Sequence, residues 1–156
     1  MIQTLNRIFE LDAFKELNPE EIDWLQEKSK LKSFEKGEFI FSPGNPSASV
    51  LFVVEGRVKL GAFNNDGKEM IKHIFFQNEL FGIMAISNQK LRANYSKAMD
   101  DYNEVLEIDV YDMKKLMQKN ASFSLGISKI MGDRLVQFQE RIESLMFKDT
   151  STRVID

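Results

Sequence analysis

Between Leu31 and Asp109 the sequence alternates short apolar runs with clusters of turn residues, and this pattern constrains the fold more than any other feature. The turn clusters are Lys36-Gly37-Glu38, Ser42-Pro43-Gly44-Asn45-Pro46, Glu55-Gly56-Arg57 and Asn64-Asn65-Asp66-Gly67. The runs beside them are rich in Val, Ile, Leu and Phe, as short strands are, and cover 39–41, 49–54, 58–63, 69–76, 94–98 and 103–109. Several short strands with closely spaced turns predict an antiparallel roll, barrel or sandwich.

Helical patterns flank this strand-rich region on both sides. Before it, Met1–Phe14 has apolar residues near helical spacing, and Asn18-Pro19-Glu20-Glu21 predicts the capped start of a second helix that ends near Ser29. After it, we expect a helix at Tyr111–Gln118 and a longer one at Ala121–Phe147. The expected fold class is therefore mainly β with flanking helices (α+β).

The long C-terminal helix carries a coiled-coil pattern. Such a helix would be about 40 Å long, which is too long to lie wholly on so small a roll. Its apolar residues step by four, four, three, four and three, which predicts a homodimer interface at Ile127, Met131, Leu135, Phe138, Ile142 and Leu145. The alternative is that this stripe covers the domain's own sheet, and near Phe123 and Ile127 we expect that it does.

The segment from Gln77 to Ile108 interrupts the strands with a short apolar turn followed by an arginine. Gly82 allows close approach of the backbone to a neighbour or ligand, and Ile83–Ile86 is long enough for one short helix with amides that could hold an anion. Arg92 is a fork-shaped permanent cation that suits a pair of phosphate oxygens. We therefore expect a ligand site formed by Phe81, Gly82, Ile83, Met84, Arg92, Ala93 and Asn94. The alternative is a plain connection with a surface arginine, because one Gly and one Arg make a weak motif.

Composition and charge exclude several classes of protein. The chain contains no cysteine, which removes disulfides, iron–sulfur clusters and thiol nucleophiles. Its net charge is −3 without a concentrated basic segment, so we expect this chain by itself to bind nucleic acid poorly. The longest apolar run, Val50–Val54, is far too short to span a bilayer. We expect a cytoplasmic protein without a membrane partner.

Catalytic and metal sites are not expected either. The carboxylate pairs Glu20-Glu21 and Asp100-Asp101 consist of adjacent residues, whose side chains point apart on a helix or strand and do not share a substrate. The oxygen-rich segment Asn64–Gly67 lacks the glutamate of a calcium loop and instead predicts a hairpin turn. A haem at His73 is disfavoured because no cysteine is available as the other ligand. His73 is expected at the surface or at a sheet edge.

Several spaced segments together resemble the cyclic-nucleotide-binding fold of the Crp/Fnr transcription regulators. They are Phe39-Ile40-Phe41-Ser42-Pro43-Gly44, residues 51–59, Asp66-Gly67-Lys68-Glu69 and Phe81-Gly82. The resemblance implies a jelly roll, or double-stranded β-helix, with N-terminal helices over residues 1–120. It further implies a dimerisation helix over 121–147. Residues 148–156 then resemble the hinge to a winged helix-turn-helix domain that is absent from this chain, so DNA binding is expected only through that missing domain.

The chain departs from the cyclic-AMP-binding form of that family at two places. After Phe-Gly that form has a glutamate for the ribose hydroxyl, whereas this chain has Ile83. After the phosphate-binding arginine it has Ser or Thr and then Ala, whereas Arg92 is followed by Ala93 and Asn94. Loss of these groups should reduce the affinity for cyclic AMP by roughly two orders of magnitude.

Two functions are therefore open at this point. The first is a ligand-sensing, dimerising regulatory domain with an unknown small-molecule effector other than cyclic AMP. The second is a structural dimerisation scaffold whose pocket is filled by its own side chains, namely Ile83, Met84, Met70 and Tyr95. The volume of the pocket separates these two functions.

Overall fold

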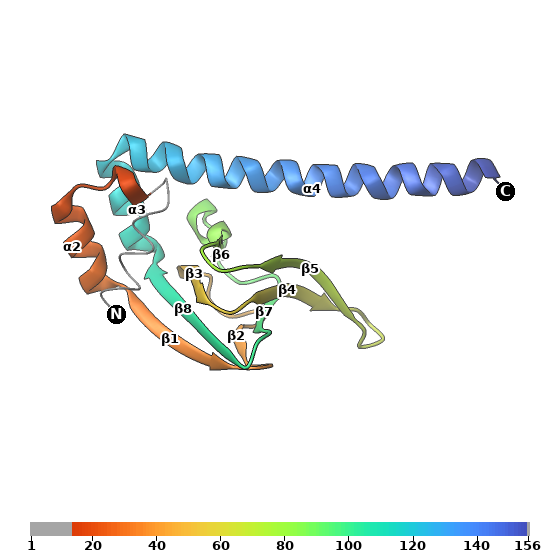
Figure 1. The fold of residues 1–156 in the computed structure, drawn as a ribbon, viewed down its shortest axis with the longest axis horizontal. Helices are drawn as coiled ribbons and strands as arrows, with labels where there is room; N and C mark the ends of the chain where they lie inside the picture. The colour runs from red at the N-terminus through yellow and green to blue at the C-terminus, as the bar shows by residue number, and fades with distance from the viewer. Residues whose placement is uncertain (1–13, 156) are drawn as a thin grey trace.

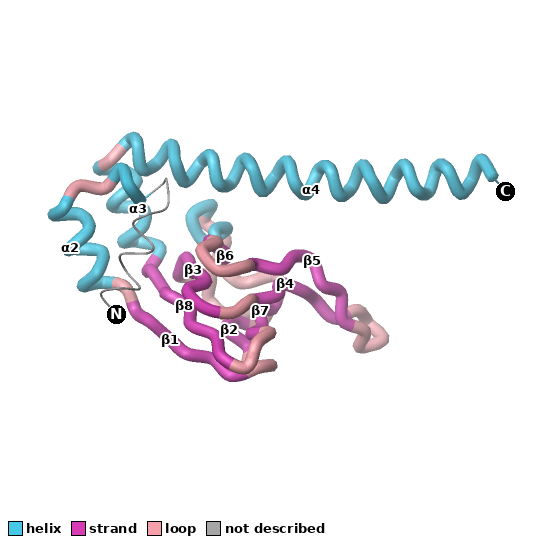
Figure 2. Tube along the Cα trace, in the orientation of Figure 1, coloured by secondary structure: helices cyan, strands magenta, loops and turns pink. Residues whose placement is uncertain are grey.

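The computed structural model describes residues 14–155, which form two β-sheets, a group of helices at one end and a long helix that runs along one side (Figures 1 and 2). The helix expected at Met1–Phe14 lies almost wholly outside these residues. The long helix passes over the roll and continues beyond it, so the C-terminal end of α4 projects away from the sheets (Figure 1).

Eight strands pair antiparallel in two four-stranded sheets with the orders β1-β8-β3-β6 and β2-β7-β4-β5. Their bounds are β1 Lys30–Glu35, β2 Phe39–Phe41, β3 Ser49–Glu55, β4 Val58–Phe63, β5 Glu69–Phe75, β6 Leu80–Phe81, β7 Tyr95–Ala98 and β8 Tyr102–Asp109. Most turns carry the chain from one sheet to the other, as in a jelly roll. The predicted fold class is confirmed.

The six predicted strands correspond to β2, β3, β4, β5, β7 and β8, each within one residue at either end. Two further strands were not predicted. In β1, four of the six residues are exposed, so its sequence lacks the apolar content of the other strands. The strand β6 has two residues, which is too short to produce a sequence pattern.

The helical segments are η1 Phe14–Glu16, α2 Pro19–Lys28, η2 Ile83–Ser87, α3 Val110–Lys119 and α4 Ala121–Ile155. The predicted cap of α2 is present, because the Glu21 amide donates to Asn18 Oδ1 at 2.8 Å and the Asn18 amide donates to Glu21 Oε1 at 3.0 Å. The prediction that the last helix ends at Phe147 was wrong. No glycine or proline occurs between Lys148 and Ile155 to end it, and α4 continues through the segment expected to be a hinge.

Two apolar cores hold these layers together. One lies between the first sheet and the helices, and it includes Phe14, Phe52, Phe123 and Ile127, all with 0% of their surface exposed. The other lies between the two sheets and contains Val53, Val58, Phe75, Phe81 and Val105, among others. Ile127 therefore belongs to the chain's own core, and its assignment to the dimer interface was wrong. A stripe with steps of three and four is equally typical of a helix that covers its own sheet.

In the part of the chain that the structure describes, no helix combines the length and the hydrophobicity that a membrane crossing requires.

Candidate ligand-binding site

A cavity of about 400 Å³ lies between the roll and the middle of α4. Its walls are mainly apolar, and the apolar lining residues are Phe41, Leu60, Phe75, Ile83, Met84, Met131, Leu135 and Phe138. The polar side chains among the lining residues are Gln89, Arg92, Asn94 and Arg134. A volume of this size falls within the range of small-molecule sites, roughly 300–1,000 Å³.

Gly82 forms the sharp turn from β6 into η2 at the edge of the cavity. Its φ of 69° lies in the left-handed region, which glycine adopts without strain. A Cβ at this position would lie 2.8 Å from Leu51 Cδ1 and 3.0 Å from Arg92 Nη1, so the close packing also requires glycine. The short helix predicted at Ile83–Ile86 is present as η2.

Arg92 is buried beside this turn, with 5% of its surface exposed, so the alternative of a surface arginine is wrong. Its Nη1 donates to the Gly82 carbonyl oxygen at 3.0 Å, and its Nη2 donates to the Ser49 carbonyl oxygen at 2.5 Å. The guanidinium carbon lies 4.4 Å from the centroid of the Phe41 ring. Arg92 Nε is buried without a hydrogen-bond partner, and burial lowers the pKa of this guanidinium. Arg92 therefore joins η2 to β3, and Nε remains as an unused donor.

Six of the seven predicted site residues line this one cavity, namely Gly82, Ile83, Met84, Arg92, Ala93 and Asn94. The seventh, Phe81, is fully buried behind it, with its ring centroid 5.4 Å from that of Phe75 and 6.3 Å from that of Phe41. Ligand binding by these residues stays a prediction. Phe41, Leu60 and Phe75 were not predicted as site residues, because they come from three separate strands and no local motif connects them.

Arg134 lines the cavity from α4. Its side chain is 12% exposed, and its guanidinium carbon lies 4.9 Å from the centroid of the Phe75 ring. Its Nη2 lies 3.9 Å from Glu79 Oε2, which is near the limit of an ion pair. Burial lowers the pKa of Arg134, and Glu79 opposes that shift.

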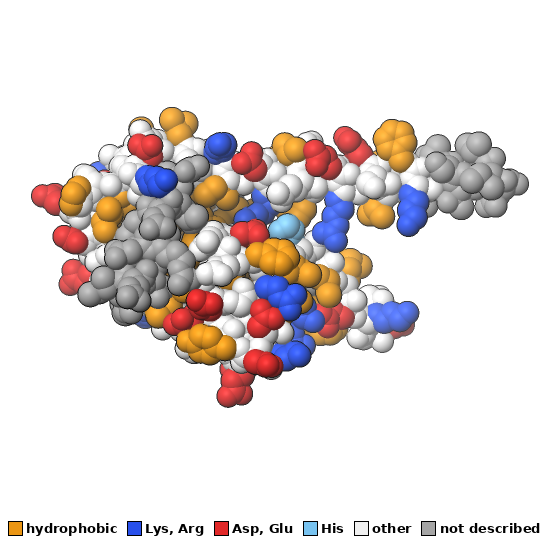
Figure 3. All heavy atoms as spheres, viewed as in Figure 1, with side chains coloured by type: hydrophobic (Ala, Val, Ile, Leu, Met, Phe, Trp, Pro, Cys, Tyr) orange, Lys and Arg blue, Asp and Glu red, His pale blue; other side chains and the backbone are white. Residues whose placement is uncertain are grey.

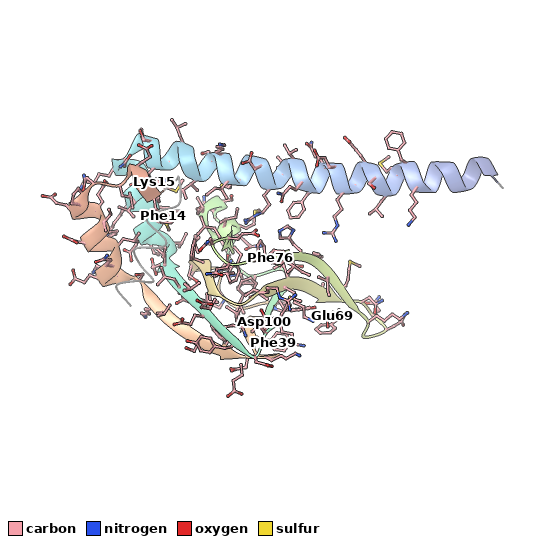
Figure 4. All side chains as sticks on the ribbon, viewed as in Figure 1. Phe14, Lys15, Phe39, Glu69, Phe76 and Asp100 are labelled. Carbon is pink, nitrogen blue, oxygen red and sulfur yellow. The ribbon has the colours of Figure 1, made fainter. Side chains whose placement is uncertain are left out.

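Of the four residues expected to fill the pocket, Ile83 is buried in its wall, and the other three leave the pocket open. Met70 and Met84 are 57% and 54% exposed, so neither is packed into the interior. Tyr95 is fully buried on a different face of its sheet, where its ring centroid lies 5.6 Å from that of Phe39 and 5.0 Å from that of Phe63. Phe39 lies on the side of the roll away from α4 (Figure 4). These positions disfavour a pocket filled by its own side chains.

His73 lies on the edge strand β5, as predicted, and α4 covers part of its ring. The ring centroid lies 4.6 Å from that of Phe75 and 5.6 Å from that of Phe138. Desolvation lowers the pKa of His73 from its ordinary value of 6.5, and the charges of Arg134 and Arg141 act in the same direction, while Glu79 opposes them. Among residues 14–155, no three His, Asp or Glu side chains form a group that could hold a metal ion.

The lowered pKa of His73 predicts a loss of stability in mild acid. As the pH falls below 6.5, the unfolded chain binds a proton at His73 more readily than the folded chain does. The free energy of unfolding should therefore decrease as the pH falls through this range toward the folded-state pKa. Urea denaturation across that range should show a smaller decrease for His73→Gln than for the unaltered chain. Equal decreases would contradict the prediction.

The comparisons with known proteins agree with this geometry. The sequence model of the family described as "Cyclic nucleotide-binding domain" matches residues 31–120. The global nitrogen regulator of Nostoc sp. is 25% identical over 127 residues, which are 80% of this chain and 56% of that protein. The CRP-like cAMP-activated global transcriptional regulator of Mycobacterium tuberculosis is 22% identical over 141 residues, which are 90% of this chain and 62% of that protein. The chain thus spans little more than half the length of these relatives.

Solved structures show the same fold. The sensor domain of the transcriptional regulator DNR from Pseudomonas aeruginosa has a TM-score of 0.76 at 19% identity, over 89% of this chain and 91% of that one. The catabolite activator protein of Thermus thermophilus has a TM-score of 0.71 at 23% identity, over 88% of this chain and 64% of that one. At these identities the likeness concerns the fold alone.

Proposed function

The chain belongs to the cyclic nucleotide-binding domain family, and from this premise we propose that it is the ligand-sensing and dimerising regulatory domain of a Crp/Fnr-type transcription regulator. The observation that carries the proposal is the apolar cavity of about 400 Å³ between the roll and α4. The relatives are named as transcription regulators, which supports a non-enzymatic role. DNA contacts are assigned to a part of the regulator outside this chain.

The position of the cavity suits a sensor, because its ligand would touch two different parts of the fold. Ile83 and Met84 line it from η2, while Met131 and Leu135 line it from α4. A ligand that contacts both parts favours the arrangement in which they are close together. Binding is thereby coupled to the position of α4, which is the requirement for transmitting a signal along that helix.

The dimer is assigned to the part of α4 that follows the residues lining the cavity. Figure 3 shows hydrophobic side chains interspersed with charged ones along this stretch, and Ile142, Leu145 and Phe147 are 57%, 63% and 73% exposed. An exposed apolar stripe on a projecting helix is typical of an interface with a second helix. Met131, Leu135 and Phe138 line the chain's own cavity, so the proposed interface rests on Ile142 and Leu145.

Neutral apolar probes test whether the cavity is a binding site. We expect decanol and naphthol to bind saturably in calorimetric titrations. Ala93 is exposed at the rim of the cavity, so Ala93→Phe should place a ring inside it and weaken both probes at least tenfold. Ala121→Phe, at an exposed position that is not among the lining residues, is the matched control and should leave binding unchanged. No saturable binding by the unaltered chain, or equal binding by Ala93→Phe, would overturn the sensing function.

Cyclic AMP is expected not to bind. Ile83 lines the cavity and stands where the cyclic-AMP-binding form of the family has a glutamate for the ribose hydroxyl, and both Nη atoms of Arg92 already donate to backbone carbonyls. Calorimetry should detect no saturable binding at high micromolar cyclic AMP, with partial recovery in the double variant Ile83→Glu, Ala93→Ser. Micromolar binding by the unaltered chain would show that other groups replace the missing ones.

A further inference from the structure

Two arginines line the cavity, and the nearest carboxylate to Arg134 is Glu79, which is not itself a lining residue. Arg92 lines it from the roll and Arg134 lines it from α4, while no Asp or Glu is among the lining residues that the structure describes. The other walls are mainly apolar. A buried cation in apolar surroundings strongly favours a negatively charged partner. The lining thus suits a ligand with an apolar body and a single anionic group.

The two arginines differ in how much of their hydrogen-bonding capacity is already used. Arg92 donates from both Nη atoms to the carbonyl oxygens of Gly82 and Ser49, and its buried Nε has no partner. Arg134, by contrast, lies 3.9 Å from the Glu79 carboxylate, which is longer than a charge-assisted hydrogen bond of about 2.7–2.9 Å. Arg134 is therefore the group whose planar fork can donate to a ligand carboxylate.

Glu79 already places a carboxylate near Arg134, and its geometry allows replacement by a ligand. Its Oε1 accepts a hydrogen bond from the Phe76 amide at 3.2 Å, and its Oε2 faces Arg134. The Glu79 side chain is 37% exposed, so it can turn toward water when another carboxylate takes its place. Replacement of one carboxylate by another keeps the charge on Arg134 balanced.

We propose that the effector is an apolar monocarboxylate whose carboxylate takes the place of Glu79 at Arg134 and so joins the roll to α4. This proposal rests on the proposed sensing function and names the chemical class of its ligand. The apolar part of the ligand lies against Phe41, Ile83 and Phe138, and the anionic end determines which state of α4 is favoured. Arg134 thus acts as the specificity-determining residue of the site.

Decanoate and decanol form a matched pair of probes, because they share an alkyl chain and differ in charge. In calorimetric titrations we expect the unaltered chain to bind decanoate about ten- to a hundredfold more tightly than decanol. This ratio of affinities corresponds to the free energy of one charge-assisted hydrogen bond. Arg134→Gln should abolish this preference while decanol still binds, which also shows that the variant is folded. Glu79→Gln removes the competing charge but keeps an oxygen for the Phe76 amide, and it should strengthen decanoate binding severalfold.

Arg141→Gln provides the matched control for removal of an arginine from α4. Arg141 donates to the Lys72 carbonyl oxygen and is not among the cavity's lining residues, so this variant should keep the preference for decanoate. Arg134→Lys retains the charge without the fork and should keep part of the preference. Equal affinities for acid and alcohol in the unaltered chain, or an unchanged preference in Arg134→Gln, would overturn the role of Arg134 while leaving the sensing function in place. Failure of both probes to bind would overturn both proposals.

Discussion

Replacement of Arg92 by methionine is expected to destabilise the fold by roughly 3 kcal/mol, as well as altering the cavity. Methionine can still lie against the Phe41 ring, but it cannot donate to the carbonyl oxygens of Gly82 and Ser49. Two hydrogen bonds from a charged donor contribute about 1.5–3 kcal/mol each, and the lower value applies because Gly82 and Ser49 are only partly buried. The link between η2 and β3 would be lost.

Urea denaturation of Arg92→Met and Arg57→Met measures this effect against a matched control. Arg57 forms an ion pair with Asp100 at 2.7 Å, with 43% and 32% of the two side chains exposed, so its loss should change stability little. Unchanged or greater stability in Arg92→Met would show that the cost of desolvating the guanidinium exceeds the value of its two hydrogen bonds. Any effect of Arg92 variants on ligand binding must be separated from this effect on the fold.

The strands were predictable because their turns are marked by residues with special backbone requirements. The glycines at 37, 44, 56, 67 and 82 all have positive φ values between 69° and 86°, which other residues rarely adopt. Their spacing therefore fixed where each strand begins and ends. The exceptions, β1 and β6, carry too little apolar periodicity or too few residues to show a pattern.

The candidate site was predictable where it is local in sequence. Gly82, Ile83, Met84 and the segment from Arg92 to Asn94 lie close together along the chain, and they share one wall of the cavity. Arg134 could not be predicted in the same way, because its position depends on how α4 is placed over the roll. In an isolated helix the same arginine flanks an apolar stripe, which is typical of a coiled-coil edge.

The apolar stripe of α4 serves two purposes, and periodicity alone cannot divide it. Ile127 packs in the core and Phe138 contacts His73, so both face the chain's own roll. Ile142 and Leu145 follow at the same spacing and are exposed, although the neighbouring Arg141 still donates to the Lys72 carbonyl oxygen of β5. The division depends on which side chains of α4 the roll covers, which is a tertiary property.

This division determines which residues should be altered to test for a dimer. Leu135 and Phe138 are poor choices, because both line the cavity and their replacement would disturb the proposed site. Ile142 and Leu145 are exposed, at 57% and 63%, and neither is a lining residue, so changes there should leave the folded chain intact.

The double variant Ile142→Glu, Leu145→Glu is therefore expected to be monomeric where the unaltered chain is dimeric. In a symmetric dimer each substitution occurs on both subunits, so four carboxylates would enter one apolar seam and repel one another. Sedimentation velocity should give the mass of one chain for the variant and of two chains for the parent. At high dilution, urea denaturation should give equal free energies of unfolding for the two proteins, which shows that the variant is folded. Leu125→Glu is the control, because it alters a residue that is 71% exposed near the other end of α4. This variant should have the mass of two chains. A parent of one-chain mass, or a variant of two-chain mass, would exclude the distal part of α4 as the dimer interface.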